Sequence, residues 1–325
     1  METDVMLSVI MPVYNHEKYV AKAIESVIAQ ETNFKYELII GEDKSTDNSL
    51  KIIREYERMH PDKIRVLARE ENMGASKNGY DLYMNARGKY IATLEGDDYW
   101  LGTEKLQRQV DFLEENPDYI ACAHRFKVVN QDEEEYYDRD FECQFFQNNP
   151  YTKEVLEKGL MLSHINSLVF RNIFKDESIN TDLWREFDVP AGDYAVTALL
   201  ILNGKMHFLD KCYSCYRKII SDVASSFSAM QERNNKRDIL FKSTIELEEF
   251  LNRNYKFDCV ERKKSTFASA VFKWYREKND KNLKVVLNII KYSKQQFRYI
   301  TWGIYLVSCR AMLDLTGRRK ERVKF

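Results

Sequence analysis

Apolar and polar positions along the first hundred residues predict strands and helices in alternation. Four short apolar runs have the length and composition of buried strands; they lie at residues 7–15, 36–40, 64–68 and 90–94. Between these runs, apolar residues recur every three or four positions, which is typical of one buried helix face. Strands and helices that alternate in this way predict a mainly parallel α/β sheet with helices on both faces.

The pattern is more varied over the next hundred residues. Helical spacing returns twice, and strand-like apolar runs lie at 119–129, 165–170 and 206–217. The acidic stretch 131–140 has no periodicity, so we expect an exposed loop or hairpin tip without fixed structure of its own.

The last hundred residues have helical patterns only, beginning near residue 228. We therefore predict an α/β domain over 1–220 and a helical module over 221–325. The apolar and aromatic run 299–307 is too short to span a bilayer. The end of the chain, 294–325, is basic, and two interpretations stay open: a helix on an anionic membrane surface, or a helix packed on the module with a solvated tail.

Composition limits the class of protein. With 44% hydrophobic and 31% charged residues in 325, the chain is globular and long enough to bury a large core. A net charge of −1 gives no reason to propose nucleic acid as a partner. Six cysteines and a polar start without an apolar leader are typical of a reducing cytoplasm. Cys212 and Cys215 lack a second pair, so we interpret them as part of a strand and not as a metal site.

The acids that follow the fourth apolar run form the most informative stretch. Glu95, Asp97 and Asp98 flank Gly96, and a glycine allows a tight turn in which Glu95 and Asp97 point the same way. Carboxylates this close repel one another unless a cation neutralises them. Such ligands suit Mg²⁺ or Mn²⁺. An ion of this kind takes one or two protein carboxylates and keeps its other coordination positions for water and substrate phosphates. The alternative is a solvated acidic turn after a core strand.

Four motifs, in this order and spacing, resemble the inverting family-two glycosyltransferases of GT-A fold. They are the strand end 12–15, the polar loop 43–47, the Asn-Met-Gly at 72–74 and the acidic turn 95–98. The loops 12–15, 41–49 and 95–98 are expected at the carboxyl edge of the sheet, where ligands of such folds bind. The resemblance covers about the first two hundred residues and not the helical end.

The resemblance implies a nucleotide-sugar donor, and it assigns roles to single residues. Asp97 would be the direct metal ligand, and Glu95 would contact the ribose or a metal-bound water. Asp43 would accept the hydrogen bond from N3 of a uracil, and Lys77 would offset diphosphate charge. The nucleotide-binding residues implied are Pro12, Tyr14, Asp43, Asn72, Lys77 and Glu95, and Asp98, Trp100 and Arg217 would contact donor or acceptor.

The resemblance also implies a catalytic base. Asp193 matches the acid at the start of a late helix, where it would take the proton of the acceptor hydroxyl; the alternative is an ordinary helix cap. Many relatives carry a histidine after the Tyr-Arg pair, and here Tyr216 and Arg217 are followed by Lys218. The contact of that histidine is therefore absent or supplied by Arg217, Lys218 or a later residue. The Gln-x-x-Arg-Trp signature of processive synthases is missing, so we expect one sugar per encounter.

The sequence thus favours a cytoplasmic, Mn²⁺- or Mg²⁺-dependent glycosyltransferase that moves a sugar from a UDP-sugar to a glycan or lipid-linked acceptor, with a peripheral membrane contact and a homo-oligomer left open. A sugar-phosphate nucleotidyltransferase would need a Gly-rich loop with Arg and Lys after the first strand, where this chain has Tyr14 and Asn15. A non-catalytic nucleotide-sugar or glycan-binding protein of the same fold is the other alternative.

Overall fold

The computed structural model describes residues 5–137, 139–142, 144–187, 192–219, 237–258, 260–293 and 296–315. The chain divides into two compact units. The first comprises Met1–Leu156 and Leu160–Val223, and the second comprises Glu157–Gly159 and Ala224–Phe325. The predicted boundary at residue 220 falls outside the described residues.

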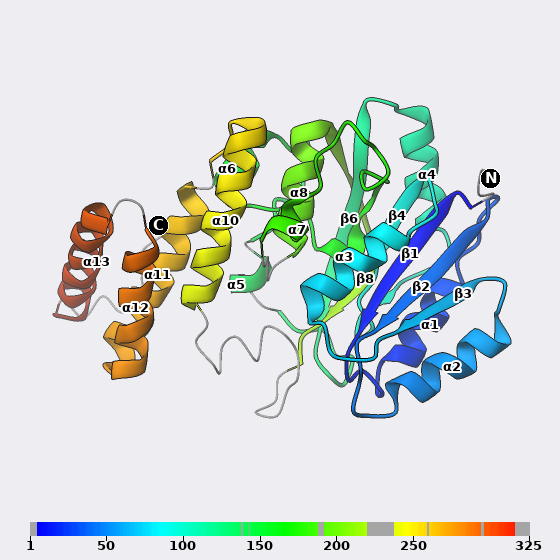
Figure 1. Ribbon diagram of the computed structural model, residues 1–325, viewed down its shortest axis with the longest axis horizontal. Coiled ribbons are helices and arrows are strands. Elements are labelled where there is room, and N and C mark those ends of the chain that lie inside the picture. The colour runs from blue at the N-terminus through cyan, green and yellow to red at the C-terminus, as the bar shows by residue number, and fades with distance from the viewer. Residues whose placement is uncertain are drawn as a thin grey trace. The chain divides into compact units, whose positions relative to one another are not determined.

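The first unit is built on one mixed sheet of eight strands (Figure 1). Their order is β3-β2-β1-β4-β7-β6-β8-β5. Strands β3, β2, β1 and β4 run parallel, β7 is antiparallel to both β4 and β6, and β8 is parallel to β6 but antiparallel to β5. The strands are β1 (Leu7–Val13), β2 (Tyr36–Glu42), β3 (Ile64–Ala68), β4 (Tyr90–Thr93), β5 (Tyr99–Trp100), β6 (Tyr119–Val129), β7 (Val169–Arg171) and β8 (Lys205–Arg217).

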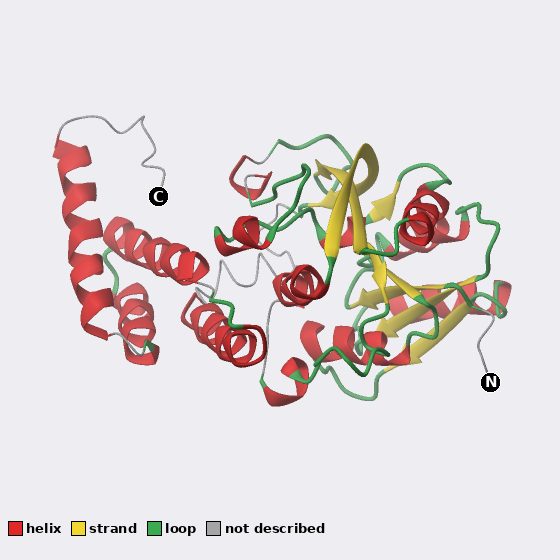
Figure 2. Cartoon of the chain, turned by 90° about the horizontal axis from the view of Figure 1, so that it is seen from above, coloured by secondary structure: helices red, strands yellow, loops and turns green. Residues whose placement is uncertain are grey.

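Helices cover both faces of this sheet (Figure 2). The helices of this unit are α1 (Val20–Ile28), α2 (Ser49–Met59), α3 (Ala75–Asn85), α4 (Lys105–Glu115), α5 (Arg139–Glu142), α7 (Leu183–Glu186) and α8 (Gly192–Asn203), with a 3-10 turn η1 (Ile165–Ser167). The short helix α6 (Lys153–Glu157) ends at the first residue of the second unit. The expected α/β architecture, a mixed and partly parallel sheet with helices on both faces, is therefore confirmed.

The periodicity of α1 explains how it packs. Val20, Ala23, Ile24 and Val27 have no exposed surface, because a spacing of three and four places them on one helix face. They belong to a core that also takes in β1 and β2, whose side chains are buried along nearly their whole length. Burial on both faces of a central parallel strand accounts for its continuous apolar run.

The expected strand at 165–170 is wrong in its first half. Residues Ile165–Ser167 form the turn η1, and only Val169–Arg171 form β7. The main-chain N–H of Asn166 donates to the His164 ring, and Ser167 Oγ donates to the His164 carbonyl at 2.6 Å. Polar side chains that bond the nearby backbone compete with the strand ladder, so the strand begins after them.

The acidic stretch 131–140 has more structure than we expected. An antiparallel bridge joins Val129 and Glu135, and the residues between them close a hairpin. Glu133 at its tip lies 3.1 Å from the Arg217 guanidinium and also pairs with Lys22. These ion pairs fix the described part of the stretch, whereas residue 138 lies outside the described residues.

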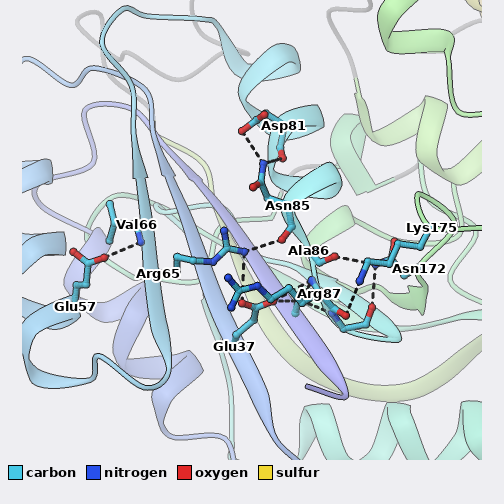
Figure 3. A network of polar contacts seen from close by, with 12 residues as sticks. Glu37, Glu57, Arg65, Val66, Asp81, Asn85, Ala86, Arg87, Asn172 and Lys175 are labelled. Atoms are coloured by element: carbon cyan, nitrogen blue, oxygen red, sulfur yellow. Dashed lines mark hydrogen bonds and ion pairs between the residues drawn. The ribbon is translucent and has the colours of Figure 1, made fainter. Parts of the chain in front are cut away.

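A polar network ties the amino ends of the strands together (Figure 3). Glu37 on β2, which is 6% exposed, accepts hydrogen bonds from Ser8 Oγ at 2.7 Å and from the Arg87 main-chain N–H at 3.1 Å. Its second oxygen lies 3.6 Å from the Arg65 guanidinium. This carboxylate is therefore compensated from within the fold.

The second unit is helical, as predicted. Its helices are α10 (Arg237–Tyr255), α11 (Val260–Glu277), α12 (Asp280–Tyr292) and α13 (Gln296–Leu315). They enclose a core that includes Phe241, Phe267, Val271, Ile289 and Leu306. Among the described residues, none of the helices combines the length and the apolarity that crossing a bilayer requires.

Candidate active site

The candidate site lies at the carboxyl ends of β1, β2 and β4. The chain leaves β1 toward β2 and later returns to β4 on the other side of β1. In α/β folds, ligands bind beyond the strand ends at such a change in strand order. The loops there are linked by hydrogen bonds: the N–H of Asn15 donates to Ser45 Oγ at 3.0 Å, and the N–H of Thr46 donates to Asn15 Oδ1 at 2.8 Å.

The acidic turn, residues 95–98, packs tightly against the end of β1. A Cβ on Gly96 would lie 2.7 Å from Val13 Cγ2 and 2.8 Å from His16 Nδ1, and the Gly96 N–H donates to Pro12 O at 3.2 Å. The expected tight turn is therefore present, and the glycine is needed for this close approach of the backbone.

The carboxylates of this turn act strongly on one another. Burial raises the pKa of Glu95 well above its usual value, and the negative charges of Asp193, Asp97 and Asp98 raise it further. Asp193 has the largest of these charge effects, although it comes from the first turn of α8, nearly a hundred residues later. Oxygen ligands that repel one another in this way fit a hard divalent cation.

Asp98, Trp100 and Arg217 have partners inside the fold. Asp98 is 1% exposed and accepts from the Arg217 main-chain N–H and from Asn166 Nδ2, each at 2.7 Å. The Trp100 indole donates to Asn166 O at 2.9 Å. The Arg217 guanidinium donates to the carbonyl of Asp97 at 2.9 Å. All three side chains hold the acidic turn in place, and their expected contacts to donor or acceptor stay predictions.

Asp43 and Asn72 are brought together at the end of β2. The Asp43 carboxylate accepts from the N–H groups of Met73 at 2.7 Å and Gly74 at 2.9 Å, and Asn72 Nδ2 donates to the Asp43 carbonyl at 3.0 Å. Burial nevertheless raises the pKa of Asp43. Each carboxylate oxygen can still accept a second hydrogen bond, which the predicted contact with a base requires.

The remaining predicted nucleotide residues are more open. Pro12 and Tyr14 are half-buried at the end of β1, and Lys77 is exposed in the first turn of α3. Sequence reasoning missed Arg69, whose positive charge lowers the pKa of Asp43. Its guanidinium lies 2.7 Å from the carboxylate of Asp81.

Two histidines were also missed. Glu95, Asp98 and His164 each offer a ligand atom, and these atoms lie within 4.8 Å of one another. His16 Nε2 lies 3.8 Å from Asp97 Oδ2. His16 directly follows the predicted loop 12–15, so its place in the sequence could have indicated it. His164 is about seventy residues from the acidic turn, and no local signal marks it.

Curated relatives match the first part of the chain. A protein of Mycobacterium tuberculosis strain H37Rv, named only as the uncharacterized protein Rv1520, is 39% identical over 126 residues, which is 39% of this chain and 36% of that protein. The putative teichuronic acid biosynthesis glycosyltransferase TuaG of Bacillus subtilis is 36% identical over 37% of this chain and 45% of its own length. The poly(ribitol-phosphate) beta-glucosyltransferase of Bacillus spizizenii is 36% identical over 38% of this chain and 19% of its own length. The chain thus matches less than half the length of these relatives.

Solved structures match almost the whole chain. Staphylococcus aureus TarS 1-349 in complex with UDP-GlcNAc is 19% identical with a TM-score of 0.62, over 99% of this chain and 94% of that one. The mannosyltransferase PcManGT from Pyrobaculum calidifontis, in complex with GDP-Man and Mn²⁺, is 16% identical with a TM-score of 0.51, over 98% and 89%. These similarities establish the GT-A fold. The family model described as glycosyl transferase family 2 matches residues 8–177, which is more than half of the chain, and the chain therefore belongs to glycosyl transferase family 2.

Proposed function

We propose that this protein is an inverting glycosyltransferase that moves a sugar from a nucleoside-diphosphate sugar to a glycan or lipid-linked acceptor. The observation that supports it most is the meeting of carboxylates from two distant segments. Asp193 from α8 adds its charge to those of Asp97 and Asp98 around Glu95. A metal-dependent transfer needs both a cation site and a separate base, and this cluster provides groups for each.

We assign most of the site residues to the binding of the donor and Asp193 to the acceptor. Asp97 would hold the divalent cation, which when bound acts as a Lewis acid on the departing diphosphate. Glu95 would contact the ribose of the donor or a metal-bound water. Asp43 would accept a hydrogen bond from the base of the donor, while Pro12 and Tyr14 border the same pocket. Asp193 would accept the proton of the acceptor hydroxyl on the side opposite the leaving group, which produces inversion in a single displacement.

Relatives support a UDP-sugar and a cell-surface polymer. A UDP-GlcNAc complex exists for TarS, and the names of two curated relatives refer to teichuronic acid and to poly(ribitol-phosphate). We infer that this chain uses a UDP-sugar with Mn²⁺ or Mg²⁺ and an acceptor of that polymer class.

The experiment is UDP release by the purified full chain. With Mn²⁺ and a panel of UDP-sugars, we expect release for at least one donor, and Asp97→Ala should abolish the metal-dependent part. Asp118→Ala is the matched control, because Asp118 is an exposed acid paired with Lys205 at 3.1 Å. A protein that binds UDP without releasing it from any donor would favour the non-catalytic alternative. Release of UTP from UDP-sugar and pyrophosphate would favour a nucleotidyltransferase.

One surface of the helical unit supports a contact with membranes. On α13, Phe297 and Ile304 are 80% and 64% exposed, and Ile300 between them is 43% exposed. Their spacing places them on one helix face, and exposed apolar side chains beside basic ones suit an anionic lipid surface. The double variant Phe297→Ser and Ile304→Ser should sediment less with phosphatidylserine vesicles than the parent. Equal sedimentation would remove this contact from the proposal. Residues 294, 295 and 316–325 of the basic end lie outside the described residues.

A further inference from the structure

Two of the expected substitutes for the missing histidine, Arg217 and Lys218, face the hairpin, and the residues 220–236 that follow them lie outside the described part of the chain. The Arg217 guanidinium bonds the carbonyl of Asp97 at 2.9 Å and pairs with Glu133 at 3.1 Å. The Lys218 ammonium lies 5.8 Å from the centre of the Tyr136 ring. A different described side chain, His16, lies beside the Asp97 carboxylate.

His16 lies beside Asp97 on the open side of the acidic turn. Its Nε2 is 3.8 Å from Asp97 Oδ2, and the two side chains are 16% and 14% exposed. Two hydrogen bonds fix the backbone of His16 here: its N–H donates to Ser49 Oγ at 2.8 Å, and its carbonyl accepts from the N–H of Val20 at 2.9 Å. Gly96 has no side chain, and this leaves room for the ring.

The distance suits two ligands of one ion better than a hydrogen bond. A hydrogen bond between nitrogen and oxygen spans roughly 2.7–3.2 Å, so 3.8 Å is too long. Two atoms that each lie about 2.1 Å from one cation are about 3.0 Å apart at right angles and at most about 4.2 Å apart. His16 Nδ1 is buried against Gly96 and makes no hydrogen bond within the described part of the chain, so Nε2 is the ring nitrogen that faces the Asp97 carboxylate.

His164 is less suited to this place. It is 5% exposed, its Nδ1 accepts from the N–H of Asn166, and its ring lies 4.5 Å from that of Tyr216. Its acidic neighbour Asp98 already accepts two hydrogen bonds from the fold. The pair that remains partly open to a donor is His16 with Asp97.

We propose that His16 is a direct ligand of the divalent cation, bound through Nε2 together with Asp97. This rests on the proposed function, and it gives the chain a histidine ligand from the first loop in place of the one it lacks after Arg217. An imidazole nitrogen favours Mn²⁺ over Mg²⁺, because Mg²⁺ is bound almost entirely by oxygen. The chain should therefore prefer Mn²⁺.

Pulsed electron paramagnetic resonance of Mn²⁺ with UDP and the full chain tests the proposal. The wild-type complex should show a ¹⁴N coupling to Mn²⁺ that changes to a ¹⁵N coupling when histidine is ¹⁵N-labelled. His16→Asn should remove the coupling and weaken Mn²⁺ binding by about 10- to 100-fold, the range for groups that tune a metal site, with a smaller loss for Mg²⁺. His164→Asn and His60→Asn should keep the coupling.

The outcomes separate this proposal from the proposed function. If Mn²⁺ binds the UDP complex but no histidine coupling appears, or the coupling persists in His16→Asn, His16 is not a ligand, while the proposed function stands. If the wild-type chain binds no Mn²⁺ with UDP, both fail. Should His16→Asn not fold, the ¹⁵N-histidine spectrum of the wild-type chain, together with that of His164→Asn, still decides the question.

Discussion

Two glutamates at opposite edges of one sheet, Glu37 buried and Glu95 partly buried, differ in what surrounds them. At the amino edge, Glu37 accepts from Ser8 and from the Arg87 N–H and lies 3.6 Å from the Arg65 guanidinium. At the carboxyl edge, burial raises the pKa of Glu95, and the charges of the neighbouring carboxylates raise it further. The charge of Glu37 is compensated by donors within the fold, whereas the charge of Glu95 would be compensated by a bound cation.

This contrast distinguishes structure from function within one unit. A carboxylate that is surrounded by hydrogen-bond donors and a guanidinium stabilises the fold, and its removal lowers the free energy of unfolding. Carboxylates that repel one another cost stability in the metal-free protein. They are retained at a site because a ligand needs them. Variants at the two edges should therefore change different measurable quantities.

The largest effect is expected for Asp193→Asn. Removal of the base should lower the turnover of the UDP-sugar donor by about 10²- to 10⁴-fold. The melting temperature and the stabilisation by UDP with Mn²⁺ should not fall, since one repelling charge is lost. Turnover by steady-state kinetics checks it, and activity within about tenfold of the parent would leave Asp193 as an ordinary residue of the α8 amino end.

Glu37→Ala should act on stability alone. It leaves the Ser8 hydroxyl, the Arg87 N–H and the Arg65 guanidinium without their shared partner, which we expect to cost about 1–3 kcal/mol in the free energy of unfolding. The dissociation constants for Mn²⁺ and UDP should be unchanged. Denaturant unfolding and calorimetric titration measure the two, and a variant that loses ligand affinity but not stability would reverse the comparison.

The pH dependence of stability should reveal Glu95. Burial and the neighbouring acids raise its pKa above the usual value near 4.5. The folded state then holds this proton more tightly than the unfolded state. The stabilisation is complete below about pH 4.5 and is lost as the pH rises through the raised pKa.

Melting curves against pH for the metal-free protein and for Glu95→Gln test this point. The parent should lose stability over that range, and the variant should lose less. UDP with Mn²⁺ should restore the parent at the higher pH. If the melting temperatures of both proteins depend on pH in the same way, the pKa of Glu95 is not raised in the folded state.

The smallest effect is expected for Lys77→Ala. Lys77 is exposed on α3, and exposed ion pairs contribute about 0.2–1 kcal/mol. The affinity for UDP should fall less than about fivefold, and added salt should reduce the difference further. Titration at two salt concentrations measures it, and a loss above about a hundredfold would make Lys77 a principal diphosphate ligand.

The sequence predicted the regular half of this fold better than the other half. Runs such as Leu7–Val13 are buried parallel strands that short loops connect to amphipathic helices, so local pattern and tertiary environment agree. The turn η1 was missed because Asn166 and Ser167 bond the nearby His164 instead of continuing a strand. A hairpin tip was one expectation for 131–140, but the ion pair that fixes it, Glu133 with Arg217, joins residues far apart in the chain and could not be predicted.

The candidate site was predictable to the same degree. The acidic turn follows directly from a strand and a glycine, so its sequence alone indicated it. The position of Asp193 came only from the family resemblance, since no local rule brings α8 to β4. The approach of His16 to Asp97 depends on the missing side chain of Gly96, a three-dimensional condition that periodicity does not encode.

The central claim is that the acidic turn holds the cation that holds the donor diphosphate. Crystals of the full chain soaked with UDP and Mn²⁺, with anomalous data collected at the manganese edge, test it most directly. We predict one strong peak within bonding distance of Asp97 and of the UDP phosphates, with Asp193 facing the same pocket. Bound UDP with no manganese beside Asp97, or an Asp193 side chain that points away from the pocket, would contradict the account.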